Sequence, residues 1–194
     1  MTQPSALRWL QDMLGKDYSN QTCGIASALE VIGERWSLLI VRDIFLGVRR
    51  FEEIQDDLGI ARNVLQTRLS SLTDAGVLER RLYREHPPRY EYLLTDKGID
   101  LWPALVALMR WGDRYEISAA GPPTLVEHEN CGGHIDEHLM CERCGEPVSA
   151  RTAKAVPGPG ASPRHPLLRQ RSGKQPAAAV ELTAPAGEPA ARPT

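Results

Sequence analysis

Hydrophobic residues recur at helical spacing over much of the chain and predict a series of short helices. The first pattern runs from Ile25 to Ile32, with apolar positions three or four residues apart, and Gly33 interrupts it. The next run, Trp36 to Leu46, is apolar nearly all round, which is typical of a helix buried on every side. Gly47 follows it, at the position where a left-handed residue often closes a helix.

Two more helices are predicted across a tight turn. The segment from Phe51 to Leu58 has apolar residues at helical spacing, and Gly59 ends it. A longer helix is expected from Ala61 to Gly76, and its apolar side is made by Val64, Leu65, Leu69 and Leu72. Two helices separated by so short a glycine-containing turn are typical of a helix-turn-helix motif.

The period of the pattern changes to two after Gly76. Polar and apolar residues alternate from Val77 to Arg84, and the alternation resumes from Arg89 to Leu94. The intervening residues include Pro87 and Pro88, which stiffen the tip of the expected β-hairpin. The expected fold is therefore mainly α with a small β-hairpin wing, which is a winged helix-turn-helix.

A further helix is predicted after Thr95, which precedes Asp96 as a capping residue would. The positions up to Trp111 are too apolar for a helix with only one covered side. Near the N-terminus a short helix carries one apolar stripe, made by Leu7, Leu10 and Leu14. We expect these two helices to pack together in a homodimer, and packing within one chain is the alternative.

Composition limits the possible partners. The 194 residues, 42% of them hydrophobic, suit one domain with an appendage. A net charge of −2 excludes a generally basic nucleic-acid-binding chain, so any contact with DNA must come from local clusters of cations. No apolar stretch approaches the roughly 20 residues that span a bilayer, and no signal peptide is recognisable. We therefore expect a cytoplasmic protein with no membrane contact.

The outward face of the Ala61–Gly76 helix is polar and rich in hydrogen-bonding side chains rather than simply charged. Asn63 and Gln66 are residue types that address adenine, and arginine addresses guanine in the major groove. Arg84 and Arg89 flank the hairpin tip, where they are candidates for phosphate or minor-groove contact. A solvated helix face with no partner is the alternative interpretation.

A second candidate site follows the winged domain. His128, Cys131, Cys141 and Cys144 have the spacing H-x2-C-x9-C-x2-C, in which two close pairs can converge on one tetrahedral Zn²⁺. His134 and His138 compete with His128 for the fourth ligand position, and His128 ranks first because its gap to Cys131 matches that between the other two cysteines. A redox dithiol and unmetallated thiols are the competing readings.

The remaining segments complete the domain organisation. Eight of the 15 prolines follow Val156, with few large apolar residues among them, so a disordered tail is expected. The predicted parts are an N-terminal dimerisation helix (1–22), the winged helix-turn-helix (23–117), a zinc-ribbon-like extension (118–155) and the tail (156–194). No nucleophile triad, phosphate-cradling loop or paired-carboxylate arrangement is recognisable, so we expect no enzymatic activity.

The ordered set of motifs from Cys23 to Tyr115 resembles the HxlR family of bacterial winged-helix transcriptional regulators. The resemblance covers about half of the chain and rests on these segments: Ala28-Leu29-Glu30-Val31-Ile32-Gly33, Arg35-Trp36-Ser37-Leu38-Leu39-Ile40, Arg49-Arg50-Phe51, Leu65-Gln66-Thr67-Arg68-Leu69, Asp74-Ala75-Gly76, Pro87-Pro88-Arg89-Tyr90-Glu91-Tyr92 and Leu94-Thr95.

The resemblance implies a homodimer that binds a pseudo-palindromic operator in double-stranded DNA, most simply as a repressor. It carries DNA contact onto these positions: Arg62, Asn63, Gln66, Thr67 and Arg68, with Arg49, Arg50, Arg84 and Arg89 nearby. Cys23 corresponds to the region where some members sense oxidants or electrophiles, and a buried, unreactive thiol is the alternative there. A zinc-containing protein-interaction module on a winged scaffold is the other function class. The effector and the regulated genes stay unidentified.

Overall fold

A computed structural model describes residue 18 and residues 21–116 and 120–171, which form two compact units. The first unit comprises the described residues up to Arg42 together with Arg50–Gly98. The second unit comprises Asp43–Arg49 and the described residues from Ile99 onward. The predicted N-terminal helix, with Leu7, Leu10 and Leu14, lies outside the described residues.

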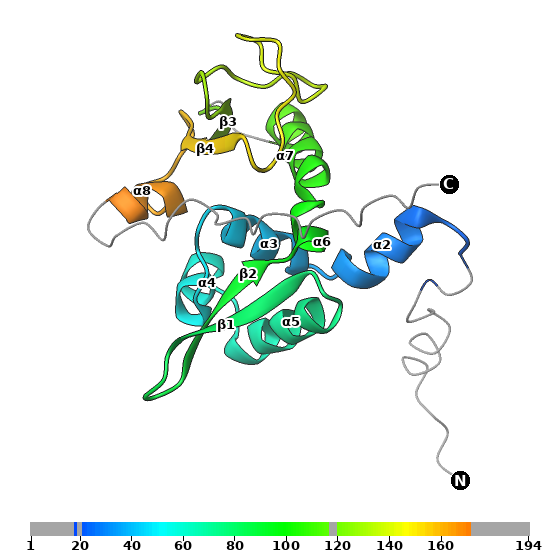
Figure 1. The fold of residues 1–194 in the computed structure, drawn as a ribbon, viewed down its shortest axis with the longest axis vertical. Coiled ribbons are helices and arrows are strands. Elements are labelled where there is room, and N and C mark those ends of the chain that lie inside the picture. The colour runs from blue at the N-terminus through cyan, green and yellow to red at the C-terminus, as the bar shows by residue number, and fades with distance from the viewer. Residues whose placement is uncertain (1–17, 19–20, 117–119, 172–194) are drawn as a thin grey trace, which may run out of the picture. The chain divides into compact units, whose positions relative to one another are not determined.

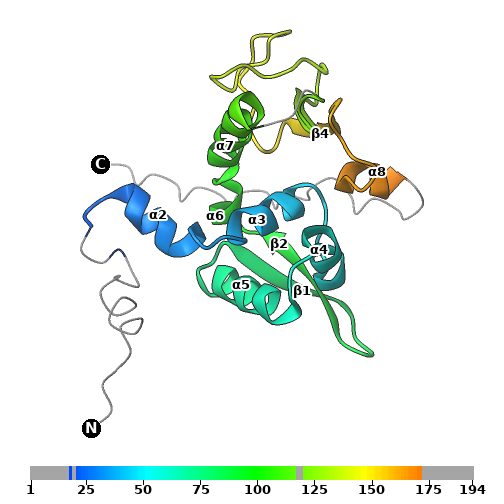
Figure 2. The ribbon, with the colours of Figure 1, turned by 180° about the vertical axis from the view of Figure 1, so that it is seen from behind.

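The first unit has the predicted winged helix-turn-helix arrangement (Figure 1). Its elements in chain order are α2 (Gly24–Ile32), α3 (Ser37–Phe45, whose last three residues belong to the second unit), α4 (Phe51–Leu58), α5 (Arg62–Asp74), β1 (Leu78–Arg84), β2 (Arg89–Leu94) and α6 (Asp96–Ile99, whose last residue belongs to the second unit). Seen from the front and from behind, α5 lies alongside the β1–β2 hairpin, and the hairpin tip projects beyond the helices (Figures 1 and 2).

The turn between α4 and α5 forms as the glycine pattern predicts. Gly59 adopts the left-handed conformation with φ of 61°, and its N–H donates to the carbonyl of Gln55. Leu65, Leu69 and Leu72 on α5 are fully buried, as is Ile54 on α4. These apolar faces hold the two helices together and leave the other side of α5 in contact with solvent.

The wing is a two-stranded antiparallel sheet in which Leu78 pairs with Leu94 and Leu82 with Tyr90. A bulge between Leu82 and Arg84 shifts the register just before the tip. The hydroxyl of Thr95 donates to the Gly76 carbonyl at 2.6 Å. It also accepts the N–H of Gly98 at 3.2 Å, which confirms the predicted capping role at the start of α6.

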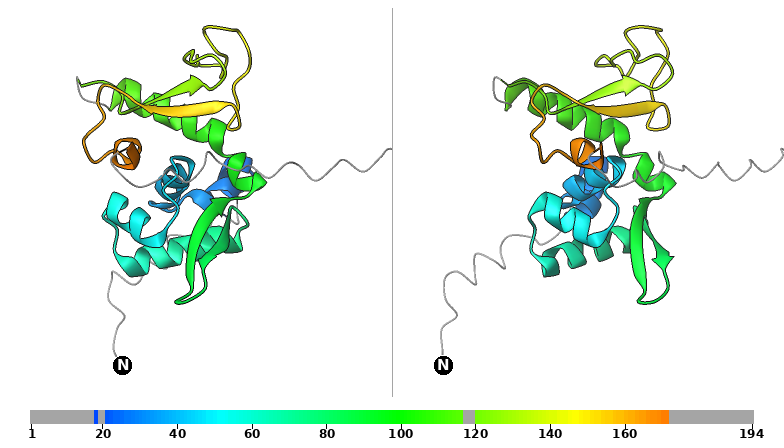
Figure 3. Two further views of the ribbon diagram at one scale, coloured as in Figure 1. Left: turned by 60° about the vertical axis from the view of Figure 1, so that its left-hand side comes forward. Right: turned by 90° about the vertical axis from the view of Figure 1, so that its left-hand side faces the viewer.

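The second unit contains α7 (Trp102–Tyr115), β3 (Thr124–His128), β4 (Ala153–Pro157) and α8 (Pro166–Arg171). β3 and β4 pair antiparallel, and both views in Figure 3 show this two-stranded sheet beside α7. The core of the unit joins the helix to the extension, and its buried members are Trp102, Val106, Ile135, Cys141 and Val148.

Three details differ from the sequence-based expectations. The long helix after Thr95 is broken into α6 and α7, because Pro103 has no N–H to donate to the carbonyl one turn earlier, and proline instead occupies the first turn of a new helix. One face of α7 packs within the chain, as the alternative interpretation held, because Trp102 and Val106 contact the extension.

The predicted tail also begins too early. Residues 153–157 form β4, since they complete the backbone hydrogen bonds of β3, and α8 follows. Residues 172–194 lie outside the described ranges. Among the described helices, none combines the length and the apolar character that crossing a membrane requires.

Candidate functional site

The exposed side of α5 carries the polar side chains that the sequence pattern singled out. Arg62, Asn63, Gln66 and Thr67 are all exposed, on the side away from Leu65 and the other buried leucines. The hydroxyl of Thr67 donates to the Asn63 carbonyl at 2.9 Å, one turn earlier on the same helix. Arg62 and Asn63 are both exposed to solvent at the start of the helix.

Two arginines near this face are held by aromatic rings. The guanidinium carbon of Arg62 lies 4.7 Å from the centre of the Phe51 ring, which joins the start of α5 to α4. Arg50 lies 4.5 Å from the Tyr83 ring on the wing, and its Nη1 is 3.5 Å from Glu53. These contacts restrict long side chains that would otherwise lose more conformational freedom on binding a ligand.

The wing presents arginines from both strands. Arg84 and Arg89 are exposed at the end of the hairpin, and Nε of Arg84 donates to the His86 carbonyl at 3.0 Å. Arg80 lies 3.9 Å above the ring of Tyr90, a contact that sequence reasoning missed. An arginine and a tyrosine on facing strands can form such a contact, but predicting it requires the register of the hairpin, which the sequence pattern does not give.

Arg49 and Arg68 are less available for contact with DNA than the sequence suggested. The side chain of Arg49 is only 7% exposed, which contradicts its prediction as a DNA contact, since a buried guanidinium cannot reach phosphate. Nη2 of Arg68 lies 3.1 Å from Glu34, so this arginine is already neutralised by an acid of the same unit. Among the arginines predicted to contact DNA, Arg62 at the start of α5 and Arg84 and Arg89 on the wing are exposed, as is Arg50.

The structure brings together the four predicted metal-ligating residues in the second unit. The candidate ligand atoms of His128, Cys131, Cys141 and Cys144 all lie within 4.8 Å of one another. His128 is the histidine that lies within this cluster, whereas the exposed His138 lies beside Glu137. His134 contributes only its backbone carbonyl nearby, which accepts the N–H of Glu142.

The spacing within this cluster suits a tetrahedral cation. The sulfur of Cys131 lies 3.3 Å from that of Cys141 and 3.6 Å from that of Cys144, and Nδ1 of His128 lies 3.2 Å from the Cys144 sulfur. A tetrahedral Zn²⁺ with Zn–S bonds of about 2.3 Å separates its sulfur ligands by about 3.8 Å. The cysteines are free thiols, since a disulfide would need about 2.05 Å.

Electrostatics within the cluster favour a bound cation. Burial raises the pKa of Cys141, but backbone hydrogen bonds from Cys144 and Arg143 and those from neighbouring thiols outweigh it and lower the value to about 6. The N–H of Glu146 lowers the pKa of Cys144, yet burial and the adjacent thiols raise it overall. A first thiolate therefore forms readily, and a second needs a compensating positive charge.

Glycine allows the loops around this cluster to approach closely. A Cβ atom added at Gly133 would lie 2.5 Å from the sulfur of Cys141 and 2.5 Å from the side chain of Arg143. Any larger residue there would push the two ligand-bearing loops apart. Gly133 is thus a steric requirement for the loop that carries Cys131 to pack against the loop that carries Cys141.

Cys23 lies apart from these cysteines, in the first unit, where it precedes α2 as the N-cap residue. Its side chain is exposed, which contradicts the alternative of a buried thiol. Backbone hydrogen bonds from Ala26 and Ile25 lower its pKa below the ordinary 9.0, because the free N–H groups of a helix start stabilise a thiolate.

Comparison with known proteins places these features in context. Residues 31–119 match the family model of the HxlR-like helix-turn-helix. Rv3095 of Mycobacterium tuberculosis H37Rv, named an HTH-type transcriptional regulator, is 47% identical over 136 residues, which are 70% of this chain and 86% of that protein. YdeP of Bacillus subtilis 168, with the same designation, is 32% identical over 107 residues, covering 53% of this chain and 84% of its own. The crystal structure of PA1607 aligns with a TM-score of 0.55 at 36% identity and covers 70% of this chain and 94% of its own.

Proposed function

Because this chain belongs to the HxlR-like helix-turn-helix family, it is a transcriptional regulator with a helix-turn-helix DNA-binding domain and not an enzyme, and we propose that it acts as a homodimeric repressor on a pseudo-palindromic operator. A two-fold symmetric dimer presents two copies of α5, so its operator repeats one half-site in inverted orientation. Repression follows where the bound dimer covers a promoter.

The observation that carries this proposal is the exposed, prearranged face at the start of α5. Arg62 is held by Phe51, and Asn63 and Gln66 follow on the same helix, so bidentate contacts to guanine and adenine are available. We assign base reading to these three residues. Thr67, whose hydroxyl is already bonded to its own helix, is assigned to phosphate or van der Waals contact.

The wing supplies the second part of the DNA surface. Arg84 and Arg89 lie at its exposed end, and Arg50 is positioned between α4 and the wing by Tyr83. Arginines in this arrangement bind the phosphates that flank a half-site and fix the register of the recognition helix. Arg68 is assigned a supporting role through its ion pair with Glu34 rather than direct contact.

Dimerisation is supported by an apolar stripe on α7. Leu108, Trp111 and Tyr115 lie three or four residues apart and are 53%, 57% and 62% exposed. They occupy the side of α7 opposite Trp102 and Val106, which already pack against the extension. Large aromatic residues in such a stripe are typical of a protein–protein interface, and we assign it to the second copy of this chain.

The cluster of His128, Cys131, Cys141 and Cys144 is proposed to hold a structural Zn²⁺. The donor set, its spacing and the low pKa of Cys141 fit this ion, whose four protein ligands would leave no open position for catalysis. The ion would connect the loop after β3 to the loop before β4. Since Cys141 is also part of the core beside α7, zinc would stabilise the packing of the extension on that helix.

A thiol-based sensor at Cys23 is the second candidate function. It is favoured by the exposure of this cysteine and its lowered pKa at the start of α2. The expected consequence is faster alkylation by iodoacetamide than for an unstructured cysteine peptide, with a pH midpoint below that of the peptide, because the reactive thiolate persists to lower pH. Mass spectrometry of the alkylated protein across pH measures this. A midpoint at or above that of the peptide would remove Cys23 as a sensor.

Selection of bound sequences from a pool of random duplexes tests the main proposal. An inverted repeat with half-sites centred about one helical turn apart, or a multiple of that, is expected from a symmetric dimer. Enrichment of a single unrepeated site would refute the homodimeric arrangement. The absence of any enrichment would favour the zinc-containing protein-interaction module instead.

A further inference from the structure

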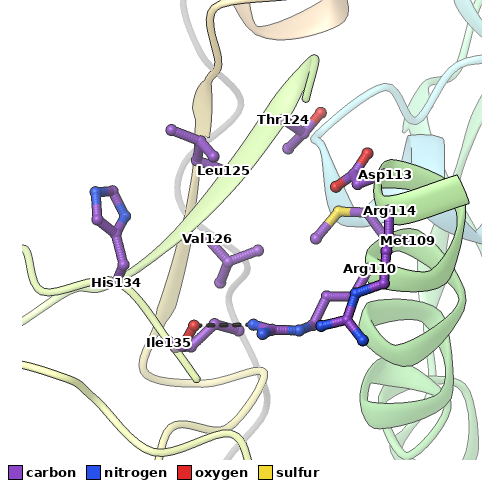
Figure 4. Close-up of a pocket in the computed structure, with 9 residues that line it drawn as sticks. All are labelled: Met109, Arg110, Asp113, Arg114, Thr124, Leu125, Val126, His134 and Ile135. Atoms are coloured by element: carbon purple, nitrogen blue, oxygen red, sulfur yellow. Dashed lines mark hydrogen bonds between the residues drawn. The ribbon is translucent and has the colours of Figure 1, made fainter. Parts of the chain in front are cut away.

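A pocket in the second unit lies between α7 and β3, and the function proposed above does not use it. Its volume is about 360 Å³, within the range of roughly 300–1,000 Å³ that is typical of small-molecule sites. Figure 4 shows Met109 of α7 and Val126 of β3 facing each other across its middle. Every residue that lines it belongs to the second unit.

One edge of this pocket is cationic. The side chains of Arg110 and Arg114, one helical turn apart on α7, run along its lower edge in Figure 4. Nη1 of Arg110 donates to the carbonyl of Ile135 at 2.9 Å, which fixes that guanidinium in place, and Glu137 lies 3.9 Å from its Nη2. Within the described ranges, Arg114 has no acidic group at ion-pair distance.

The opposite edge of the pocket carries side chains that can accept hydrogen bonds. Asp113 and Thr124 lie along the upper edge in Figure 4. Burial raises the pKa of Asp113, and the nearby Arg110 opposes that effect, so this carboxyl group is partly shielded from water. The pocket thus has a cationic edge, an apolar middle and an acidic edge, in that order.

This order of charges selects a ligand of matching pattern. Two guanidinium groups one turn apart repel each other, and a carboxylate beside them would relieve the repulsion and accept paired hydrogen bonds. An aromatic ring fits between Met109 and Val126, since a thioether contacts ring edges favourably. A hydrogen-bond donor at the far end of the ring would then meet Asp113.

We propose that this pocket binds a small aromatic carboxylic acid that carries a hydrogen-bond donor opposite its carboxylate. Arg114 and Arg110 hold the carboxylate, Met109 and Val126 enclose the ring, and Asp113 accepts the donor. The site goes beyond the regulatory function proposed above, and the proposal concerns only the binding of this ligand. Its failure would leave the DNA-binding proposal unaffected.

Saturation-transfer difference NMR on the full chain tests the site, with p-hydroxybenzoate as the probe and p-hydroxybenzamide as its uncharged counterpart. Binding of the acid at millimolar concentration is expected, with the amide weaker by about tenfold because it lacks the charge-assisted bonds. Arg114→Gln should weaken binding of the acid by about the same factor. Lys154→Gln is the matched control, because it removes an exposed cation of β4 that does not line the pocket.

Val126→Trp fills the apolar middle and should abolish binding, with circular dichroism as the check on folding. Arg114 is exposed, so its substitution keeps the test valid if the tryptophan variant fails to fold. The absence of saturation transfer to the acid in the unmodified protein would overturn the proposal. Equal binding by Arg114→Gln would also overturn it, and so would binding that persists in a folded Val126→Trp protein.

Discussion

The guanidinium of Arg62 lies over the ring of Phe51, so the first exposed cation of α5 is held by the preceding helix. If this contact prearranges Arg62 for DNA, Phe51→Leu should weaken operator binding by about two- to fivefold, the equivalent of roughly 0.5–1 kcal/mol for an exposed cation–π contact. Phe51→Tyr, which keeps a ring, is the control and should bind normally. Fluorescence anisotropy at one fixed salt concentration makes the comparison, and equal loss in both variants would point to general destabilisation instead.

The wing arginines are predicted to act on phosphates rather than bases. Arg89→Ala should weaken binding to operator and shuffled DNA by similar factors and reduce the dependence of log affinity on log salt concentration by about one. Arg81→Ala is the matched control, because Arg81 is paired with Glu91 at 2.8 Å on the same hairpin. An unchanged salt dependence in the Arg89 variant would contradict the assignment.

The apolar stripe on α7 should govern the oligomeric state. Trp111→Asp places a charge in the proposed interface, where its desolvation is unfavourable, and should yield a monomer of 21.5 kDa. Lys154→Asp, at the exposed position of β4, introduces the same side chain elsewhere in the unit and should leave the dimer intact. Sedimentation velocity distinguishes the two masses, and a dimer that survives Trp111→Asp would place the interface elsewhere.

Zinc content is predicted to depend on the four clustered residues. Protein purified without chelators should contain about one zinc per chain, and His128→Ala or Cys144→Ser should reduce that content and the melting temperature together. His134→Ala and His138→Ala are the controls and should retain the metal. Elemental analysis gives the stoichiometry. A metal-free native protein, or equal loss in the His134 variant, would contradict the proposed ligand set.

Local patterns predicted the first unit well, because its helices are bounded by features that act locally. The end of α4 requires a left-handed residue, which Gly59 can supply without strain, and the leucines of α5 repeat at the spacing that buries one face. The break between α6 and α7 could also be read from Pro103, yet the continuous apolar pattern concealed it. Burial of Arg49 depends on packing across distant segments, which no local pattern contains.

Only part of the second unit could be predicted from sequence. The spacing of the four metal-ligating residues identified their cluster, since close pairs of ligands are a local feature. The pairing of β3 with β4 joins segments about 30 residues apart, so no local pattern predicts β4, and the boundary expected between extension and tail falls inside it. The pocket beside α7 went unnoticed for the same reason, because its walls meet only through that packing.

Sequence-specific regulation requires that the surface around α5 recognises one DNA sequence. The most direct measurement is fluorescence anisotropy of the full chain on the selected inverted repeat and on a shuffled duplex of equal composition, at one stated salt concentration. We expect tighter binding to the repeat by about a thousandfold or more, and loss of most of that preference in Asn63→Ala. Equal affinity for the two duplexes would contradict sequence-specific regulation by this surface.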